Sequence, residues 1–393
     1  MADRVFSGEI WREFIAALEG LGSLVLADDV PARPQDRAEG WRYLLRFLGS
    51  GIRVVVPAGD PDYPEFCRMI ENGMSWGLDN PDCNYSWARV RGDASYRIGG
   101  NRGSARHLEF QVNTGHFGDG NVGGWRTVSS IHGRELVSEP DGSFEIVLSP
   151  EPQPGNWMAL DPDASFLLLR QYMSDWENER PADLFIERID AEYPQPALTP
   201  ERIAARMDEL VTWLSAGARS WENMSRLILA TPPNQIEMTK PLEGNAGLRG
   251  QSYGLGHYEC GPDEAVIVEF EPPECLMWGV QLSGWFWESM EFGARQSSLN
   301  GSQAVLDSDG MFRGVIAHVD PCVPNWIDPE GHESGTIGIR YLFPDRVTQP
   351  TFRTVPVAAV REALPEATPA VSPDERRRTL ERRRRSVQLR YRY

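Results

Sequence analysis

The chain of 393 residues contains an internal repeat, and this repeat limits the folds that it can adopt. Four blocks recur in the same order at spacings of 168 to 170 residues: TGHFGD (114–119) with SGWFWE (283–288), SSIHGRELVSEPDGSF (129–144) with SSLNGSQAVLDSDGMF (297–312), PGNW (154–157) with VPNW (323–326), and RQY (170–172) with RYL (340–342). A nearly constant spacing over four ordered blocks indicates two copies of one domain-sized unit.

Each copy has the pattern of short strands separated by tight turns. Apolar and polar residues alternate between clusters of Gly, Pro, Asn and Asp, and the pairs Asp141-Gly142 and Asp309-Gly310 are typical of hairpin turns. The sequence therefore predicts a mainly β fold with helical additions, in which two tandem jelly-roll-like antiparallel β-sandwiches are related by internal duplication. A single large β-sandwich with one shared core is the alternative.

Helical periodicity surrounds the strand-rich copies. One helix is expected over residues 8–21, with Ser7 as N-cap, and another over 199–230, with Pro200 in its first turn. A helix within residues 33–50 has Trp41, Leu44, Leu45 and Leu48 as its apolar positions and is expected to end at Gly49. The predicted division is N-terminal helices (1–50), first sandwich (51–195), helical block (196–235), second sandwich (236–348), and Pro-rich linker with a basic C-terminal helix (349–393).

The C-terminal segment is basic, whereas the rest of the chain is acidic. Residues 372–393 contain nine Arg and three acidic residues, which leaves 30 basic and 54 acidic residues elsewhere, a net charge of −24. Ser372, Pro373 and Glu375 form a helix-capping signal. We expect this helix to dock on an acidic surface of its own body or of a neighbouring subunit in a homo-oligomer; a solvated end, or binding to nucleic acid or membrane, are the alternatives. The acidic body argues against nucleic-acid and membrane partners.

Other signals favour a cytoplasmic protein. The start of the chain, MADRVFSGEIWREF, lacks a secretory signal, and no window is apolar enough for a membrane span. The five cysteines are sparse and form no C-x-x-C pair. We therefore predict a reduced protein without disulfide bonds.

The segment DGSFEIVLSPEPQPGNWMALDPDASFLLLRQY (141–172) resembles the domain-of-unknown-function family numbered 1214. The resemblance is based on the Asp-Gly turn, the Asn-Trp pair after a Pro-rich bend, and a strand ending in Arg-x-Tyr. It covers roughly residues 30–190, and residues 253–345 form a divergent second copy. The resemblance implies a bacterial β-sandwich with helical additions, and it transfers no catalytic residue.

The repeat separates structural from functional candidates. Residues present in both copies most economically serve the common fold. Asn156-Trp157 and Asn325-Trp326 are therefore interpreted as a structural bend, with the Asn side chain bonding backbone and the indole covering the core. Arg170 and Arg340 are expected to pair with a carboxylate or to cap carbonyl groups.

Positions that differ between the copies are free to form a site. His116 aligns with Trp285 and Gly118 with Trp287, whereas Asp119 and Glu288 keep a carboxylate in both copies. The first copy thus offers a histidine base with a carboxylate to orient it, and the second offers an apolar wall with one acid. A surface histidine beside glycines and a buried tryptophan pair is the alternative interpretation.

These residues lead to a hypothesis of cofactor-independent catalysis. The chain lacks nucleotide-binding and zinc motifs, so we expect no metal or nucleotide cofactor, although cation binding by Asp79 and Asp82, or by His257 and Glu259, stays open. We predict a lyase or hydrolase acting on a small apolar or aromatic compound in a pocket between the sandwiches. The catalytic candidates are His116, Asp119 and Glu288, and the substrate-binding candidates are Trp285, Trp287, Arg97, Arg295 and His332. The alternative is a non-catalytic protein that binds carbohydrate or another protein.

Overall fold

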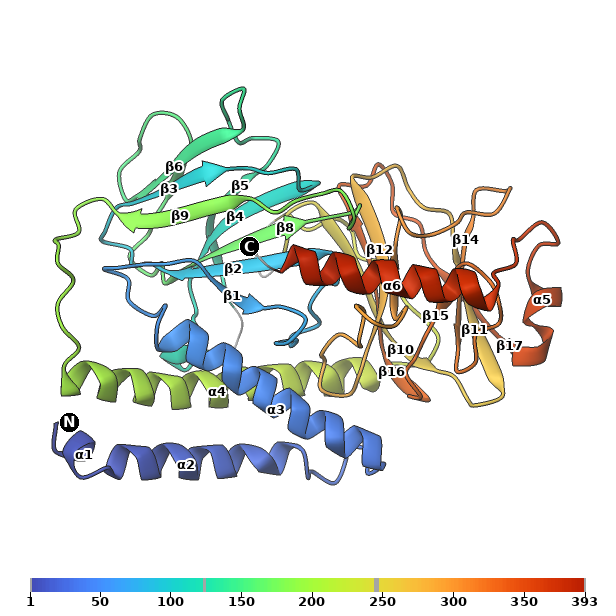
Figure 1. Ribbon diagram of the computed structural model, residues 1–393, viewed down its shortest axis with the longest axis horizontal. Coiled ribbons are helices and arrows are strands. Elements are labelled where there is room, and N and C mark those ends of the chain that lie inside the picture. Colours follow the sequence, from blue (N-terminus) through green and yellow to red (C-terminus); the bar gives the residue numbers. More distant parts are fainter. Residues whose placement is uncertain (1, 123–124, 244–246, 392–393) are drawn as a thin grey trace. The chain divides into compact units, whose positions relative to one another are not determined.

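The computed structural model describes residues 2–122, 125–243 and 247–391 (Figure 1). These residues form two compact units. Unit 1 comprises Met1–Trp76, Cys83–Tyr172 and Arg180–Glu222, and unit 2 comprises Gly77–Asp82, Met173–Glu179 and Asn223–Tyr393. Both units contain two β-sheets with helical additions.

Unit 1 contains one sheet in the order β1-β2-β8-β4-β5 and a second in the order β7-β6-β3-β9. Its strands are β1 (Cys67–Ile70), β2 (Cys83–Arg89), β3 (Tyr96–Asn101), β4 (His107–Asn113), β5 (Thr127–His132), β6 (Ser143–Ser149), β7 (Trp157–Ala159), β8 (Phe166–Tyr172) and β9 (Asp183–Arg188). The rings of Phe110 on β4 and Phe144 on β6 lie 5.8 Å apart between centroids. The two sheets therefore face each other as a sandwich.

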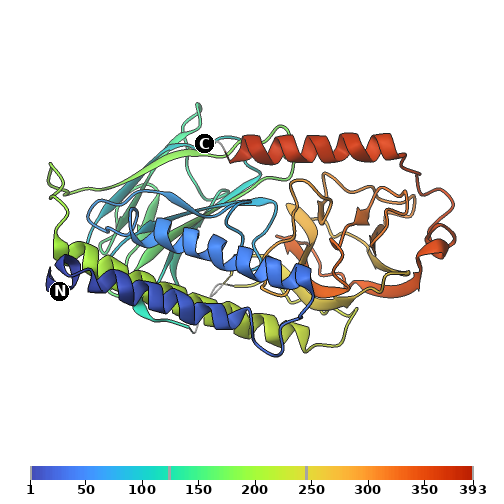
Figure 2. The same cartoon turned by 60° about the horizontal axis from the view of Figure 1, so that its bottom comes forward.

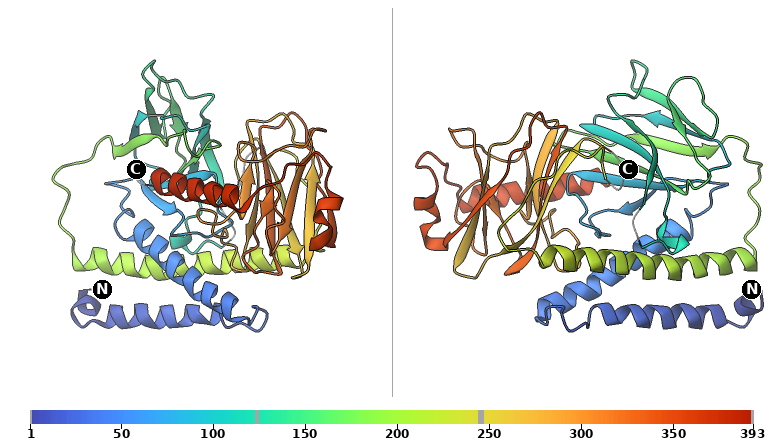
Figure 3. Two further views of the ribbon diagram at one scale, coloured as in Figure 1. Left: turned by 45° about the vertical axis from the view of Figure 1, so that its right-hand side comes forward. Right: turned by 180° about the vertical axis from the view of Figure 1, so that it is seen from behind.

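Unit 2 repeats this plan with sheets in the orders β10-β16-β12-β13 and β15-β14-β11-β17. Its strands are β10 (Gln251–Glu259), β11 (Glu264–Phe270), β12 (Met277–Ser283), β13 (Ser298–Asn300), β14 (Phe312–Ala317), β15 (Trp326–Ile327), β16 (Ser334–Leu342) and β17 (Thr351–Pro356). Figure 3 shows the two sheets of this unit from two sides. Buried residues of both sheets, including Val268, Val280 and Ile339, form one core within unit 2.

The strand orders match when β10–β17 are aligned with β2–β9 in sequence. Even the short parallel pair β6-β7, the exception among otherwise antiparallel neighbours, recurs as β14-β15. The predicted fold class, tandem antiparallel sandwiches related by internal duplication, is therefore confirmed. Strand β17 lies in the segment interpreted as a linker. Its counterpart is β9, and its backbone pairs with β11, as that of β9 pairs with β3.

The Asn-Trp bends serve the same structural purpose in both units. Asn156 Nδ2 donates to the carbonyl groups of Val137 and Glu145 at 2.8 and 2.9 Å, and its Oδ1 accepts from the amide of Val137. Asn325 forms the same two-way contact with the backbone of Val305, at 2.7 and 2.9 Å. The interpretation of these asparagines as structural residues is confirmed.

The paired arginines are structural as well. Arg170 donates to Glu109 and Gln111, both at 2.9 Å, and all three side chains are buried. Arg340 donates to Gln281, the counterpart of Gln111, and to the carbonyl group of Leu78 at 2.8 Å. One copy thus pairs its arginine with a carboxylate, and the other caps a carbonyl group, as expected.

The N-terminal additions to unit 1 are helices α1 (Ala2–Phe6), α2 (Glu9–Leu21) and α3 (Pro34–Val55) (Figure 2). Helix α4 (Pro200–Leu229) follows the first sandwich in the sequence. The N-cap of α2 is Gly8, at φ 70°, and Ser7 was therefore the wrong cap. Helix α3 continues past Gly49 to Val55, so the expected end at Gly49 was wrong. Gly51 lies against the ring of Trp213 on α4, where a larger side chain would collide. Two of the four expected apolar positions of α3, Trp41 and Leu45, are exposed.

Helix α4 has 30 residues and runs without interruption through the predicted helix over 199–230. Thr199 Oγ1 accepts from the amide of Arg202, which confirms the expected start beside Pro200. Its Trp213 stacks on Phe47 of α3, with ring centroids 4.6 Å apart. Among the described residues, no helix is long and apolar enough to cross a membrane.

The basic tail forms helix α6 (Pro373–Arg390), which follows the short α5 (Val360–Ala363), and it begins with the expected capping box of Ser372 and Glu375. Three of its arginines, Arg376, Arg383 and Arg390, recur every seven residues and are buried against unit 2. The guanidinium carbons of Arg383 and Arg390 lie 4.7 and 4.8 Å from the centre of the Trp176 ring. The helix therefore docks on the same unit through arginine side chains.

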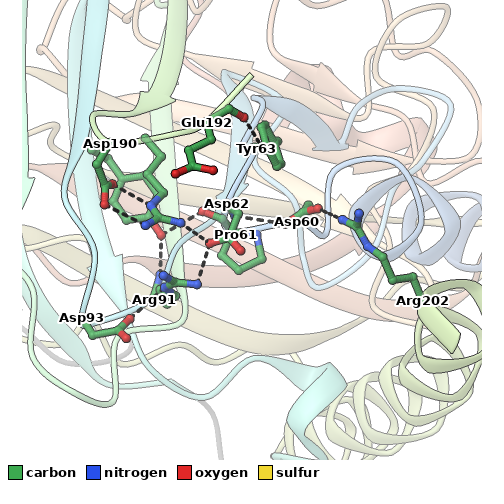
Figure 4. Close-up of polar contacts among 11 residues, drawn as sticks. Asp60, Pro61, Asp62, Tyr63, Arg91, Asp93, Asp190, Glu192 and Arg202 are labelled. Carbon is green, nitrogen blue, oxygen red and sulfur yellow. Dashed lines mark hydrogen bonds and ion pairs between the residues drawn. The ribbon is translucent and has the colours of Figure 1, made fainter. Parts of the chain in front are cut away.

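An ion network on unit 1 fixes the segment before β1 and the beginning of α4 (Figure 4). Asp62 accepts from Arg91 at 2.5 Å and from Arg188 at 2.8 Å. Asp60 pairs with Arg202 in the first turn of α4. Single exposed pairs stabilise little, but several that share partners restrict the loop more strongly. This network holds α4 against the sandwich, and α4 carries a residue of the candidate site.

Candidate functional site

His116 lies in the loop after β4, directly before the short helix η2 (Phe117–Asp119). Gly120, at φ 78°, ends this turn. The loop folds back over the outer face of the larger sheet, where the His116 ring lies 5.4 Å from Trp87 on β2 and 6.4 Å from Phe166 on β8. The imidazole is 3% exposed and thus rests on an aromatic surface.

The carboxylate that contacts His116 is Glu209 of α4. Its Oε1 lies 3.2 Å from His116 Nε2, and its Oε2 accepts from Arg206 at 2.8 Å. Because Nε2 faces a carboxylate, a neutral His116 carries its proton on this nitrogen. Nδ1 then holds the lone pair, and it has no hydrogen-bond partner among the described residues.

The electrostatics of the pair favour a neutral base beside an ionised carboxylate. Burial lowers the pKa of His116, and the hydrogen bond that His116 donates to Glu209 offsets only part of this effect. Burial acts to raise the pKa of Glu209, but the hydrogen bond from His116 and the charges of Arg89 and Arg206 outweigh it, so this pKa is lowered. A neutral imidazole oriented by a carboxylate is suited to accept a proton.

Aromatic side chains surround the pair. Phe166 lies 5.6 Å from Trp125, and Phe117 lies 5.8 Å from Trp213 and 5.9 Å from Trp221, between ring centroids. These rings come from β8, η2, α4 and the loop before β5. The surroundings match an apolar or aromatic ligand better than a strongly hydrated one.

Asp119 does not orient His116, and that part of the prediction was wrong. Its side chain is half exposed and accepts from Arg89 Nη2 at 3.2 Å, while only its backbone amide contacts His116, by donating to the carbonyl group at 3.0 Å. The turn of η2 directs the Asp119 carboxylate outward. Arg89 Nη1 is buried and has no hydrogen-bond partner among the described residues.

Gly118 is required by the close approach of this pair. A Cβ atom at this position would lie 2.7 Å from His116 Nε2 and 2.7 Å from Cγ of Glu209. The aligned residue in unit 2 is Trp287, so the equivalent loop there cannot form the same pair. The replacement of tryptophan by glycine between the copies was a sequence signal for this site.

The aligned loop of unit 2 places its candidates differently. Trp287 is buried, adopts φ 58°, and accepts from the amide of Leu78 at 2.6 Å through its carbonyl group. Trp285 is partly buried, and its carbonyl group accepts from Ser225 Oγ. Glu288 is buried, and its carbonyl group accepts from the amide of Gly284 at 3.2 Å. These residues share one short loop of unit 2.

The remaining substrate-binding candidates occupy other surfaces. Arg97 on β3 pairs with Glu145 at 3.1 Å and Glu187 at 3.0 Å on the neighbouring strands, so it forms a cross-strand ion pair. Arg295 pairs with Asp328 at 2.8 Å. His332 is buried in unit 2, and its carbonyl group accepts from the Tyr258 hydroxyl at 3.3 Å.

A buried histidine pair in unit 1 escaped the sequence analysis. His132 Nδ1 lies 3.3 Å from His107 Nε2, and both residues are 2% exposed. Burial, with a smaller contribution from the neighbouring His132, lowers the pKa of His107 to about 3. The alternation in HLEFQVN, which places His107, Glu109 and Gln111 on one face of β4, could have indicated this polar row.

The two segments considered for cations have other partners. Asp79 accepts from the amide of Ser289 at 2.9 Å, and Asp82 accepts from Trp176 at 2.7 Å and Asn300 at 2.5 Å. Nε2 of His257 lies 3.8 Å from Oε1 of Glu259. In the described part of the chain, no group of three or more His, Cys, Asp or Glu side chains could hold a metal ion.

Fold and site together define a tandem β-sandwich protein with a buried carboxylate–histidine pair in its first sandwich. A crystal structure of an uncharacterized protein from Burkholderia cenocepacia is 30% identical, has a TM-score of 0.86, and aligns over 91% of this chain and 100% of that chain. The chain belongs to the same family as this Burkholderia protein. A protein from Vibrio parahaemolyticus is 12% identical, with a TM-score of 0.42, over 79% of this chain and 97% of that one. No family model and no curated protein matches the sequence.

Proposed function

We propose that unit 1 is catalytic and that His116 acts as a general base on a small aromatic or apolar substrate. The observation that carries this proposal is the buried contact between His116 and Glu209 on a surface of aromatic rings. The reaction would be of the lyase or hydrolase type and would proceed without a metal or nucleotide cofactor. It begins when Nδ1 removes a proton from the substrate or from a water molecule.

Each neighbour of His116 has a definite role in this mechanism. Glu209 accepts the Nε2 proton, fixes the ring, and stabilises the imidazolium that forms when Nδ1 gains a proton. Trp87 and Phe166 are both 2% exposed and hold the imidazole in place, and the partly exposed Trp125 offers its ring to the apolar body of the substrate. Arg89, through the buried Nη1, holds an anionic group of the substrate. An aromatic carboxylic acid satisfies all these contacts.

The carbohydrate-binding alternative depended on Trp285 and Trp287 lying exposed on a flat face, and the burial of Trp287 argues against it. The assignment to the family numbered 1214 is proposed on the Asp-Gly, Asn-Trp and Arg-x-Tyr residues alone. That family supplies no catalytic role to compare with His116.

The decisive experiment determines the protonation of His116 in the full chain. With only 6 histidines, selective ¹⁵N labelling and long-range ¹H–¹⁵N spectra resolve each ring, and His116→Gln identifies the signals of His116. We expect a neutral ring with its proton on Nε2 at pH 7. A ring protonated on both nitrogens, or one that carries its proton on Nδ1, would show that His116 is not the base.

A turnover assay tests the substrate class. Purified protein is incubated with a panel of aromatic acids, their esters and their neutral analogues, and the products are followed by mass spectrometry. The proposal expects turnover of acids that His116→Gln reduces and Arg89→Gln weakens mainly through KM. A substrate turned over equally by wild type and His116→Gln would contradict it.

A further inference from the structure

Large exposed apolar side chains gather on the N-terminal helices of unit 1. On α1, α2, α3 and the turn after α2, the exposed ones are Phe6, Trp11, Ile15, Leu26, Trp41, Leu45, Ile52 and Val56. Leu45 is 70% exposed and Trp11 is 60% exposed. Scattered apolar residues are normal on a protein surface, but a contiguous group of large ones marks an interaction site.

Helix α3 is apolar on two opposite faces. Its inner face, which includes Tyr43 and Phe47, is buried, with Phe47 stacked on Trp213 of α4. Its exposed residues Trp41, Leu45 and Ile52, and Val56 directly after its end, fall within about 60° of one another around the axis, at 100° per residue. A helix that packs against a single core has a polar face toward solvent. A helix that is apolar on two opposite faces is normally covered by protein on both of them.

Helix α2 contributes a second apolar strip. Ile10 and Phe14 are buried, whereas Trp11 and Ile15, one turn apart, are exposed. Gly22, at the end of α2, lies close to the Trp41 ring, so the strips of α2 and α3 adjoin there. We call this combined surface of exposed α2 and α3 residues the helical face.

The size of the helical face suits a protein partner. The exposed side chains of the helical face present an apolar area on the order of 600 Å². A specific protein–protein interface of standard size buries about 800 Å² on each partner. One partner of similar dimensions could therefore cover the whole face.

The charges of the two helices identify the partner. Helix α2 contains three Glu and one Arg, and α3 contains four Arg and two acidic residues, so their net charges are −2 and +2. A two-fold axis places the same patch of both partners in contact. If α2 of one copy lies against α3 of the other, both contacts join opposite charges around an apolar seam.

We propose that the helical face binds a second copy of this chain, with α2 of each copy packed against α3 of the other. The result is a two-fold dimer held by a four-helix seam. The seam is separate from His116, and the proposal does not depend on catalysis.

Sedimentation equilibrium of the full chain tests the dimer. We expect wild type to dimerise and Trp11→Glu/Leu45→Glu to raise the dissociation constant by at least about 100-fold, because it buries charges in the seam. Both side chains are already exposed, so the fold should survive, and circular dichroism checks this. The matched control is Val137→Glu, an isolated 72% exposed residue of unit 1 outside these helices, which should dimerise as wild type does.

Charge reversal tests the orientation of the helices. Glu9→Arg/Glu19→Arg on α2 and Arg42→Glu/Arg46→Glu on α3 should each weaken the dimer, and the combination of both sets should restore it. A photo-crosslinker at position 45 should give a covalent dimer joined to peptides of α2. This readout serves even if a charged variant fails to fold.

Several outcomes would overturn the proposal. A wild-type chain that stays monomeric, or a dimer that persists in folded Trp11→Glu/Leu45→Glu, excludes this face as the dimer interface. A monomer that binds phosphatidylcholine–phosphatidylglycerol vesicles through Trp11 and Leu45 would assign the face to lipid instead. Crosslinks from position 45 to segments outside α2 would refute the proposed packing.

Discussion

Glu209 and His116 are separated by 93 positions in the sequence, yet Oε1 of the first lies 3.2 Å from Nε2 of the second. The contact joins α4 to a loop of the first sandwich. It combines an oriented histidine, an ionised carboxylate and an aromatic surface. Because Glu209 and not Asp119 makes this contact, replacing each of the two should have different effects.

Replacing Glu209 should impair the base, whereas replacing Asp119 should not. Glu209→Gln keeps the size of the side chain but removes the charge that stabilises the imidazolium. We expect turnover of an identified substrate to fall by about 10²–10⁴-fold for His116→Gln and to fall clearly for Glu209→Gln. Asp119→Asn is the matched control and should stay close to wild type. Equal losses in Glu209→Gln and Asp119→Asn would contradict the assignment of Glu209.

The stability of unit 1 should depend on pH through His107. The pKa of His107 is lowered to about 3 in the folded chain, so the unfolded chain, with an ordinary histidine pKa near 6.5, binds the proton more readily. The contribution of the buried neutral His107 to the free energy of unfolding is complete above about pH 6.5 and is lost as the pH falls toward 3. Denaturant titrations of wild type and His107→Gln across this range should show a smaller loss of unfolding free energy in the variant. Parallel curves would contradict the burial of a neutral His107.

The two bend asparagines should contribute comparably to stability. Asn325→Ala removes a two-way hydrogen bond with the backbone of Val305, and Asn156→Ala removes the equivalent contact with Val137. Each should lower the free energy of unfolding by roughly 1–3 kcal/mol, and Asn325 more than Asn156 because it is more deeply buried. Asn121→Ala, which loses the bond from Nδ2 to the carbonyl group of Gly115 outside both bends, is the control. Urea unfolding measures all three variants.

The docking of α6 should depend on its buried arginines and not on its exposed ones. Arg383 donates to Phe292, Gln303 and Ser298 and lies over Trp176, whereas Arg385 is exposed. Arg383→Met should weaken the docking by roughly 2–5 kcal/mol, because buried acceptors lose their donors. Arg385→Met should leave it unchanged. Hydrogen exchange of the α6 amides, followed by mass spectrometry, reports the difference; equal protection in both variants would refute the role of Arg383.

The sequence by itself determined the features that depend on neighbouring residues or on the internal repeat. The alternation of the strands, the Asp-Gly turns and the capping box at Ser372 are local patterns, and the spacing of 168 to 170 residues identified the two sandwiches. The repeat also separated Asn156 and Asn325, which are structural, from His116, which differs between the copies. Periodicity predicted that α3 is helical, but a helix with two apolar faces does not indicate which face is inward.

The tertiary structure decided which distant residues meet. The sequence proposed Asp119 as the partner of His116 because it lies three positions away, but the short turn of η2 directs that carboxylate to Arg89. Glu209 reaches His116 because α4 packs across the sandwich, and no local pattern records that packing. A sequence thus fixes elements through interactions between near neighbours, whereas the partner of a buried histidine depends on how those elements pack.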